Sequence, residues 1–382
     1  MLIFISVVGV FLGLVHFWLY RRLVRASETG PRGALLAGVV LTTGWLLAVI
    51  GFGSGTYFAT SWARPLGYIG MTWLAVVFYL VLGTVLIGVM LLTGRIIRIR
   101  AARPGDVRRR NFVRVTGIVM VVGAVAATTY GAVAALNPRV TTTVVDLEGL
   151  PAEFDGIRVA VVADLHVGPS LGAGFTQKVV DLINEQDPDL IVMTGDLIDG
   201  TVDKVGADIA SLAELEAPLG IFAVSGNHEY YSDDVNAWLD YWESLGITVL
   251  RNEHATISLG DEEIDIAGVH DYDAPEPDPA DMAAALEGRD PTGFVMLLAH
   301  QPLHSGEAAE RGVDFQISGH THGGQIWPFH YAVQAVHDTA LVGLDRVGAT
   351  TLYTTSGAGA WGPPVRVGAP PEIPILELRS AP

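Results

Sequence analysis

Four long apolar stretches in the first third of the chain restrict its fold more than any other feature. They run from Met1 to Tyr20, from Gly33 to Phe52, from Leu66 to Leu92 and from Phe112 to Leu136. Each reaches the about 20 residues that a helix needs to cross the hydrocarbon core of a bilayer. We therefore predict four transmembrane helices and expect the lipid bilayer to be one partner of this protein.

The two parts of the chain carry opposite charge. Residues 1–135 contain 13 arginines, no lysine and two acidic residues, whereas residues 136–382 contain 39 acidic and 10 basic residues. The arginines gather after the first and third apolar stretches, and only Arg64 lies between the second and the third. Because basic loops stay in the cytoplasm, we expect a multi-pass membrane protein whose N-terminus and C-terminal part lie outside the cytoplasm.

These features divide the chain into a membrane domain over residues 1–136, a connector over 137–155 and a second domain over 156–382. The acidic charge of the second domain argues against nucleic acid as a partner, since phosphate backbones need basic side chains. The chain has no cysteine, so any bound metal must be held by nitrogen and oxygen atoms.

The second domain has the pattern of an α/β fold. Short runs of Val, Ile and Leu alternate with stretches of helical spacing at Leu171 to Gln186, Val205 to Leu215 and Asp234 to Leu245. A first strand is predicted in the connector, over Thr141 to Val145.

Five of the predicted strands end in side chains that can bind a metal. The runs at 159–163, 190–195, 221–226, 294–299 and 315–319 lead to Asp164 and His166, Asp196, Asn227 and His228, His300, and His320 and His322. Functional groups of α/β sheets gather beyond the carboxyl ends of the strands, so we expect these side chains at one rim. In extended backbone His320 and His322 would point to the same side.

The chemistry of this set indicates a metal centre. Burying so many polar side chains is costly unless they pair or bind a metal, and ligands without sulfur suit Mn, Fe or Zn. The set is large enough for two ions. Two ions about 3.5 to 4 Å apart can clamp a phosphoryl group and activate a bridging water for in-line attack.

The order of the motifs resembles the signature of the calcineurin-like metallophosphoesterase family over about residues 155–380. The matching motifs are Asp164-x-His166, Gly195-Asp196, Gly226-Asn227-His228-Glu229, His300 and Gly319-His320-Thr321-His322. The stretches 323–325, 356–366 and 370–373 are similar to the membrane-associated bacterial branch. This resemblance implies two packed mixed β-sheets flanked by helices, following the four transmembrane helices, and hydrolysis of a phosphoester by metal-activated water.

The resemblance also implies a role for each residue. Two divalent or trivalent ions would be bound, one by Asp164, His166, Asp196 and His322, the other by Asp196, Asn227, His300 and His320, so that Asp196 bridges them. His228 would act on the substrate as a hydrogen-bond or proton donor, as an imidazole near neutrality can.

Several readings stay open at this stage. Asp199 supports the site or forms a turn or helix cap, Glu229 orients His228 or is a surface or helix-start carboxylate, and Arg366 binds phosphate or forms a salt bridge. The four predicted transmembrane helices would anchor the protein in the membrane, and this favours a lipid or cell-envelope glycolipid as the phosphorylated substrate. The alternatives are a general phosphodiesterase or nucleotidase acting on soluble compounds, and an inactive sensor or scaffold. The sequence selects neither the native metal nor the oligomeric state.

Overall fold

Four long helices and a two-sheet domain make up the computed structural model, which describes residues 2–25, 29–96, 107–232 and 234–381. The helices are α1 (Leu2–Leu19), α2 (Pro31–Gly53), α3 (Thr60–Ile96) and α4 (Val107–Ala135), and a π-helical turn (Tyr20–Arg25) follows α1. Each helical segment is long and apolar enough to cross a membrane. The four predicted spans are therefore confirmed as helices.

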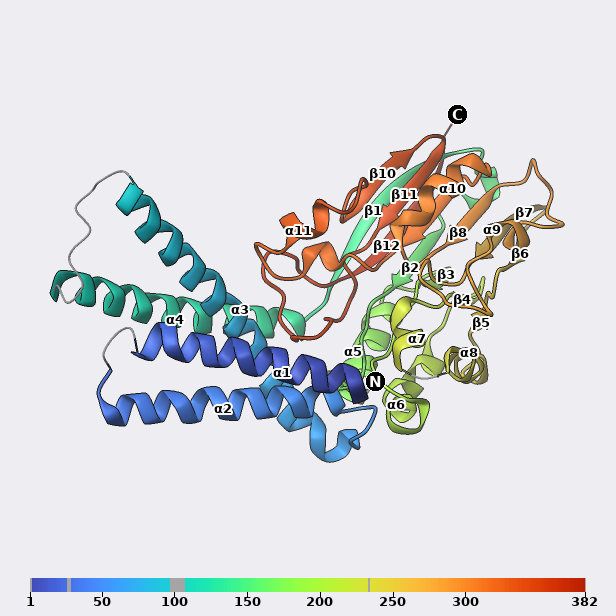
Figure 1. Cartoon of the computed structure of the whole chain (residues 1–382). Coiled ribbons are helices and arrows are strands. Elements are labelled where there is room, and N and C mark those ends of the chain that lie inside the picture. Colours follow the sequence, from blue (N-terminus) through green and yellow to red (C-terminus); the bar gives the residue numbers. More distant parts are fainter. Residues whose placement is uncertain (1, 26–28, 97–106, 233, 382) are drawn as a thin grey trace.

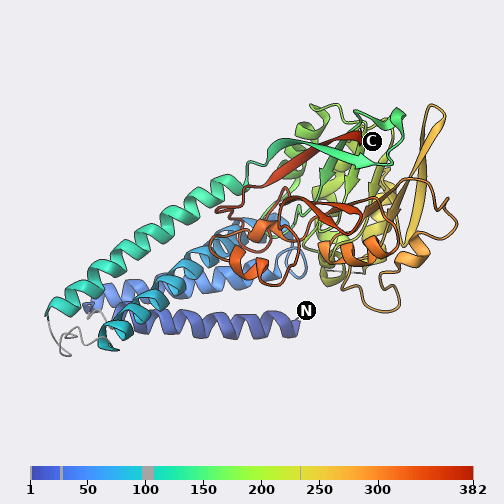
Figure 2. The same cartoon turned by 90° about the horizontal axis from the view of Figure 1, so that it is seen from above.

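The helices extend from one side of the domain, as Figures 1 and 2 show. The start of α1, the turn between α2 and α3 and the end of α4 all lie at the end of the bundle that faces the domain. The N-terminus and the domain thus share one side, as the topology prediction requires. Of the arginines behind that prediction, Arg98, Arg100 and Arg103 lie outside the described residues, and the orientation across the membrane stays a prediction.

One boundary differs from the prediction with a structural consequence. The third helix begins at Thr60 instead of Leu66, so Arg64 lies in its first turns and not in a loop. There Arg64 forms an ion pair with Asp208, and its Nε donates to the carbonyl of Gly168 at 2.8 Å. Hydropathy misses these turns because they lie alongside the domain, where polar side chains find partners.

The second part of the chain is a sandwich of two six-stranded mixed sheets, as expected. The first sheet has the order β1 (Arg139–Glu148), β12 (Glu372–Ala381), β2 (Arg158–Val162), β3 (Leu190–Met193), β4 (Ile221–Ala223) and β5 (Thr248–Val249). The second has the order β10 (Gly343–Val347), β11 (Thr350–Thr354), β9 (Phe315–Ser318), β8 (Val295–Leu298), β7 (Glu262–Gly268) and β6 (Glu253–Leu259).

Apolar side chains fill the space between the sheets because alternate residues of each strand point inward. Val161 and Val192 of the first sheet share this core with Met296 and Phe315 of the second. Residues 137–155, predicted as a connector, contribute the full strand β1, which pairs in parallel with β12 from Arg139 to Glu148.

Helices cover the outer faces of both sheets. The first sheet is covered by α5 (Ala173–Asn184), α6 (Val202–Ile209) and α8 (Val235–Ser244), and the second by α9 (Met282–Ala285) and α10 (Ser305–Glu310). The helix predicted over Val205 to Leu215 starts earlier and continues beyond α6 as a 3-10 turn (Ala210–Glu214). Short helices α7 (Asn227–Ser232) and α11 (His330–Gln334) complete the domain.

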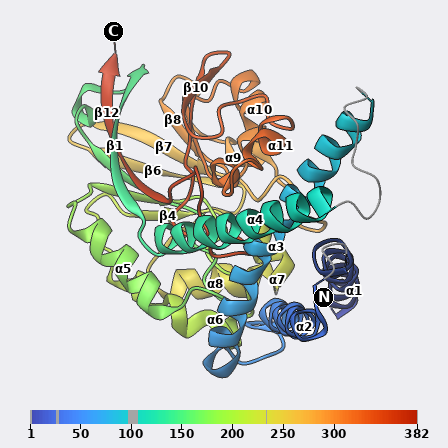
Figure 3. The same ribbon diagram turned by 90° about the vertical axis from the view of Figure 1, so that its left-hand side faces the viewer.

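The domain is packed directly against the helix bundle. Ala75 of α3 shares an apolar cluster with Ile326 and Val365. The backbone N–H of Arg366 donates to the carbonyl of Gly131 in α4 at 2.9 Å. Figure 3 shows α3 and α4 crossing in front of the domain, with α11 beside them.

Candidate metal centre

The predicted side chains meet at one edge of the sandwich, where strands of both sheets end. Asp164 follows β2, Asp196 follows β3, Asn227 begins α7 after β4, and His300 follows β8. His320 and His322 follow β9 of the same sheet as β8. The rim thus draws on both sheets, with parallel strands β2, β3 and β4 on one side and β8 and β9 on the other.

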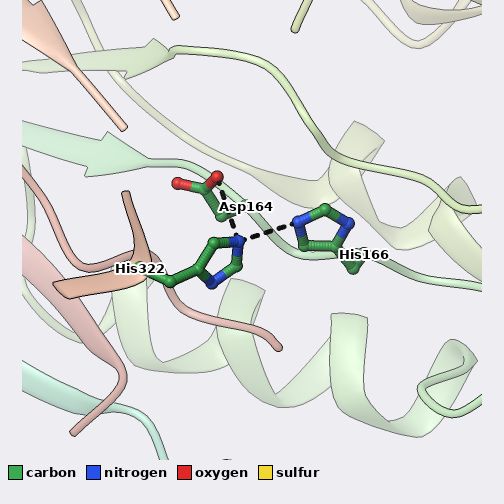
Figure 4. Close-up of side chains that lie close together, drawn as sticks. All are labelled: Asp164, His166 and His322. Carbon is green, nitrogen blue, oxygen red and sulfur yellow. Dashed lines mark hydrogen bonds and ion pairs between the residues drawn. The ribbon is translucent and has the colours of Figure 1, made fainter. Parts of the chain in front are cut away.

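The first group consists of Asp164, His166 and His322, which Figure 4 shows pointing toward one another. The Nε2 atom of His322 lies 3.0 Å from Nε2 of His166 and 3.4 Å from Oδ1 of Asp164. All three residues are buried. Three ligand atoms therefore converge on one small space.

The second group consists of Asp196, His300, His320 and Asn227. Nε2 of His300 lies 3.3 Å from Oδ2 of Asp196 and 3.1 Å from Oδ1 of Asn227. Nδ1 of His320 lies 3.0 Å from the same Asn227 oxygen. Because Oδ2 of Asp196 is also 3.7 Å from Nε2 of His166, this carboxylate lies between the two groups.

The hydrogen bonds behind these rings show that the set fits a cation. His166 donates from Nδ1 to Oδ1 of Asp199 at 3.0 Å, and His300 donates from Nδ1 to the carbonyl of Thr194 at 2.7 Å. In a neutral ring Nε2 then carries a lone pair. These lone pairs face the oxygens of Asp196 and Asn227, an arrangement that is repulsive unless a positive charge lies between them.

The electrostatics of the site also favour a positive charge. Burial raises the pKa of Asp164, whereas His300 and His228 outweigh burial at Asp196 and hold its pKa well below the usual range. Burial disfavours a charged His300, but the carboxylates of Asp196 and Asp164 raise its pKa well above the ordinary value. A buried Asp pair of this kind needs a cation for both members to be ionised.

The other two imidazoles are neutral at pH 7, the form that binds metals. Burial and the Arg366 guanidinium hold the pKa of His322 well below its usual range. Burial and the neighbouring His300 lower the pKa of His320 to about 3.

About two thirds of the chain is similar to known metallophosphoesterases. The model of the family described as calcineurin-like phosphoesterase matches residues 157–324. The chain is 32% identical over 282 residues to the uncharacterized metallophosphoesterase YkuE of Bacillus subtilis, which covers 71% of this chain and 98% of that protein. The chain belongs to the calcineurin-like phosphoesterase family.

Other members of this phosphoesterase family match over a smaller share of their own length. The chain is 34% identical over 279 residues to the transmembrane protein with metallophosphoesterase domain of Danio rerio, over 70% of this chain and 63% of that protein. It is 37% identical over 246 residues to an uncharacterized metallophosphoesterase of Helicobacter pylori, over 63% of this chain and 64% of that protein. The chain thus spans slightly less than two thirds of these relatives.

The local backbone of this phosphoesterase centre differs from the expected one. Asp164, Asp196, His320 and His322 all have left-handed φ values between 50° and 71°. This conformation is uncommon for residues other than glycine and is concentrated at functional sites. His320 and His322 are therefore not on extended backbone: the chain turns between them, and each ring joins a different group.

Two glycines allow the close approach of the loops. A Cβ atom on Gly319 would lie 2.4 Å from Oδ2 of Asp164, and one on Gly226 would lie 2.3 Å from Oδ1 of Asp196. Any larger residue would displace a carboxylate of the centre.

Asp199 connects the metal centre with His228. Its Oδ1 atom accepts from Nδ1 of His166 at 3.0 Å and from Nδ1 of His228 at 2.5 Å. Burial of His228 is outweighed by Asp196 and Asp199, which raise the pKa of His228 to about 9. Of the two readings of Asp199, the supporting one describes its contacts, since the cap position of α6 is Thr201.

Of the readings of Glu229, the helix-start carboxylate is the one observed, since Glu229 lies in the first turn of α7. Its carboxylate is fully buried and accepts from the backbone N–H groups of Asp196, Leu197 and Gly226 at 2.7 to 3.0 Å. Burial and the Asp196 carboxylate raise the pKa of Glu229 to about 7. Glu229 therefore fixes the loop that carries Asp196 instead of orienting His228.

Arg366 also differs from both of its readings. It is buried and pairs with no carboxylate among the described residues; it donates to the carbonyls of Gly359, His322 and Ser356 at 2.7 to 2.8 Å. The Nη2 atom of Arg366 also lies 2.9 Å from Nδ1 of His322. Burial lowers its pKa to about 10, so Arg366 is a cation that holds His322 in place.

The aromatic residues near the centre separate into two kinds. Tyr231 and Trp361 are half exposed and lie beside His228, with ring centroids 5.4 and 6.3 Å from it. Tyr230 instead packs inward, where its hydroxyl contacts Ser225 and His270. The ring centroid of His337 lies 6.1 Å from that of His320. His337, His228, His320 and Trp361 line one pocket, and no sequence pattern signalled this placement of His337.

Proposed function

We propose that this membrane-anchored metallophosphoesterase hydrolyses a phosphoester with water as the nucleophile. The observation that carries the proposal is the convergence of two ligand groups on Asp196. One ion would be held by Asp164, His166, Asp196 and His322, and the other by Asp196, Asn227, His300 and His320. When bound, two such ions activate water and offset the charge of the phosphoryl group.

The remaining polar residues of the centre have supporting tasks in this proposal. His228 would donate a hydrogen bond or proton to the phosphoryl oxygen or the leaving group. Because Asp199 accepts from Nδ1 of His228, Nε2 stays available to a substrate in the pocket that His228 lines. Tyr231 and Trp361 would border the substrate.

We propose a lipid or cell-envelope glycolipid phosphoester as the substrate, either a phosphodiester, a pyrophosphate or a monoester. An active site attached to four transmembrane helices meets lipid head groups at a high effective concentration. Turnover of soluble nucleotides, with no turnover of lipid phosphates in the same substrate panel, would reject this substrate class.

Metal analysis and one substitution test the enzyme against an inactive scaffold. The purified protein should contain close to two equivalents of Mn, Fe or Zn. Asp196→Asn should lose metal and phosphoester turnover together, because the residue contacts both ligand groups. Asp203→Asn, a change at an exposed carboxylate, is the matched control and should keep both. If Asp196→Asn leaves turnover intact, the proposed centre is wrong.

The catalytic domain is proposed to lie outside the cytoplasm, and a fusion tests this. A reporter that is active only outside the cytoplasm should give a signal when it is fused after Pro382. A signal from a cytoplasmic reporter at the same position would reverse the orientation.

A further inference from the structure

A cavity of about 690 Å³ extends from the metal centre to transmembrane helix α3. Its polar end is formed by His228, His320 and His322. The opposite walls are apolar and come from Ala75 and Phe78 of α3 and from Phe329, Val333 and Val336 around α11. The volume is in the range of cavities that hold one small-molecule ligand, but only one end of it can bind a phosphoryl group.

One wall of the cavity belongs to a segment with an apolar surface. This segment, residues 326–342, is called the α11 lobe. Trp327, Phe329, Tyr331 and Val336 of the lobe are between 47% and 72% exposed. The lobe protrudes from the domain on the side of the helix bundle (Figures 1 and 3). Exposed aromatic and aliphatic side chains at this place are typical of a surface that contacts the membrane interface.

The other wall is formed by helix α3. Ala75 and Phe78 belong to the segment Thr60–Met90 of α3, which is apolar enough to cross a membrane. Ala75 also packs against Ile326, the first residue of the lobe. A hydrocarbon chain that follows α3 out of the bilayer would therefore pass between Phe78 and the lobe and end at the metal centre.

We propose that this cavity binds the hydrocarbon chain of a lipid phosphoester whose phosphoryl group lies at the metal centre. The inference rests on the proposed function and assigns the residues that select a lipid. A chain between Phe78, Phe329 and Val333 would cover apolar surface that a soluble phosphoester leaves exposed to water. The substrate would enter sideways from the membrane, along α3.

A series of alkylphosphonates, from ethyl- to decylphosphonate, tests the chain site. The full-length metal-loaded protein in lipid nanodiscs is assayed with bis(p-nitrophenyl) phosphate as the reporter substrate, and each phosphonate is measured as an inhibitor. The inhibition constant should fall by up to about fourfold for each added methylene, the equivalent of about 0.8 kcal/mol of burial. Inhibition that is independent of chain length would overturn the proposal.

Three variants separate binding in the cavity from partition into the membrane, which affects every variant equally. Val333→Asp places a charge in the apolar wall and should reduce the gain per methylene at least twofold. Ala332→Trp fills the cavity from the same helix. It should weaken inhibition by decylphosphonate and leave inhibition by ethylphosphonate unchanged. Val144→Asp, on the far edge strand β1, is the matched control and should keep the wild-type dependence. If Val333→Asp and Ala332→Trp also keep the wild-type dependence on chain length, the hydrocarbon chain does not lie in this cavity.

Calorimetric titration of the same phosphonates distinguishes the two proposals, because it needs no turnover. Turnover together with chain-independent inhibition would reject the lipid site and leave the proposed phosphoesterase activity intact. Binding that tightens with chain length, in a protein that hydrolyses no phosphoester, would reject the activity and support the site.

Discussion

Arg366→Lys is the substitution with the most specific expected effect on the metal centre. The guanidinium donates to the carbonyls of Gly359, His322, Ser356 and Gly357, and its Nη2 atom lies 2.9 Å from Nδ1 of His322. A lysine keeps the charge but has one nitrogen and three donors. It therefore cannot reach both the ring and the carbonyl of His322 together with the other loop carbonyls.

The size of the effect follows from the acceptors left without a donor. Each unpaired buried acceptor costs about 1 to 3 kcal/mol, so two of them give about 2 to 6 kcal/mol. Part of this cost lowers the free energy of unfolding, and part loosens the ring of His322. Loss of a partner behind a metal ligand typically lowers metal affinity by about 10- to 100-fold.

The assay is a calorimetric titration of the metal-free full-length protein with Mn²⁺. The site of Asp164, His166 and His322 should weaken by about 10- to 100-fold, whereas the site of His300 and His320 should keep its affinity. Arg251→Lys is the control, because this arginine pairs with Asp240 at the surface. Two sites of wild-type affinity in Arg366→Lys would refute the role assigned to the guanidinium.

Two further predictions concern the support of the centre and its pH dependence. Asp199→Asn removes the carboxylate shared by two imidazoles, so kcat on a chromogenic phosphodiester should fall by about 10- to 100-fold; an unchanged kcat would contradict this. Burial lowers the pKa of His304 to about 4, so the unfolded chain binds its proton first as pH falls below about 6.5. Between pH 7 and pH 5 this His should cost the folded state about 2 kcal/mol. Thermal unfolding of His304→Gln should therefore be less acid-sensitive than that of the wild type, and equal sensitivity would show that His304 contributes nothing.

The strand-end pattern predicted most of the centre because it is local in the sequence. Each ligand candidate comes two to four residues after a run such as Val159 to Val162, and a buried strand positions whatever follows it. The pattern needs no knowledge of which sheet the strand joins. It therefore placed Asp164 and His300 at a common rim although they belong to different sheets.

The partners of Glu229 and Arg366 could not be predicted in the same way. Both side chains bind mainly backbone atoms, and every residue type carries these atoms, so no residue pattern marks the partner. Arg366 and His322 are 44 positions apart in the chain, and His322 itself has left-handed backbone where extended backbone was expected.

The contacts of Arg366 also bear on what the helices contribute. Its side chain holds His322, while its backbone N–H bonds Gly131 of α4 at 2.9 Å. The adjacent Val365 packs against Ala75 of α3. One short segment therefore connects two transmembrane helices with a metal-ligand candidate. Since α3 also forms a wall of the cavity, the bundle is part of the site, and a domain cut free of it would lose both a wall and a support of His322.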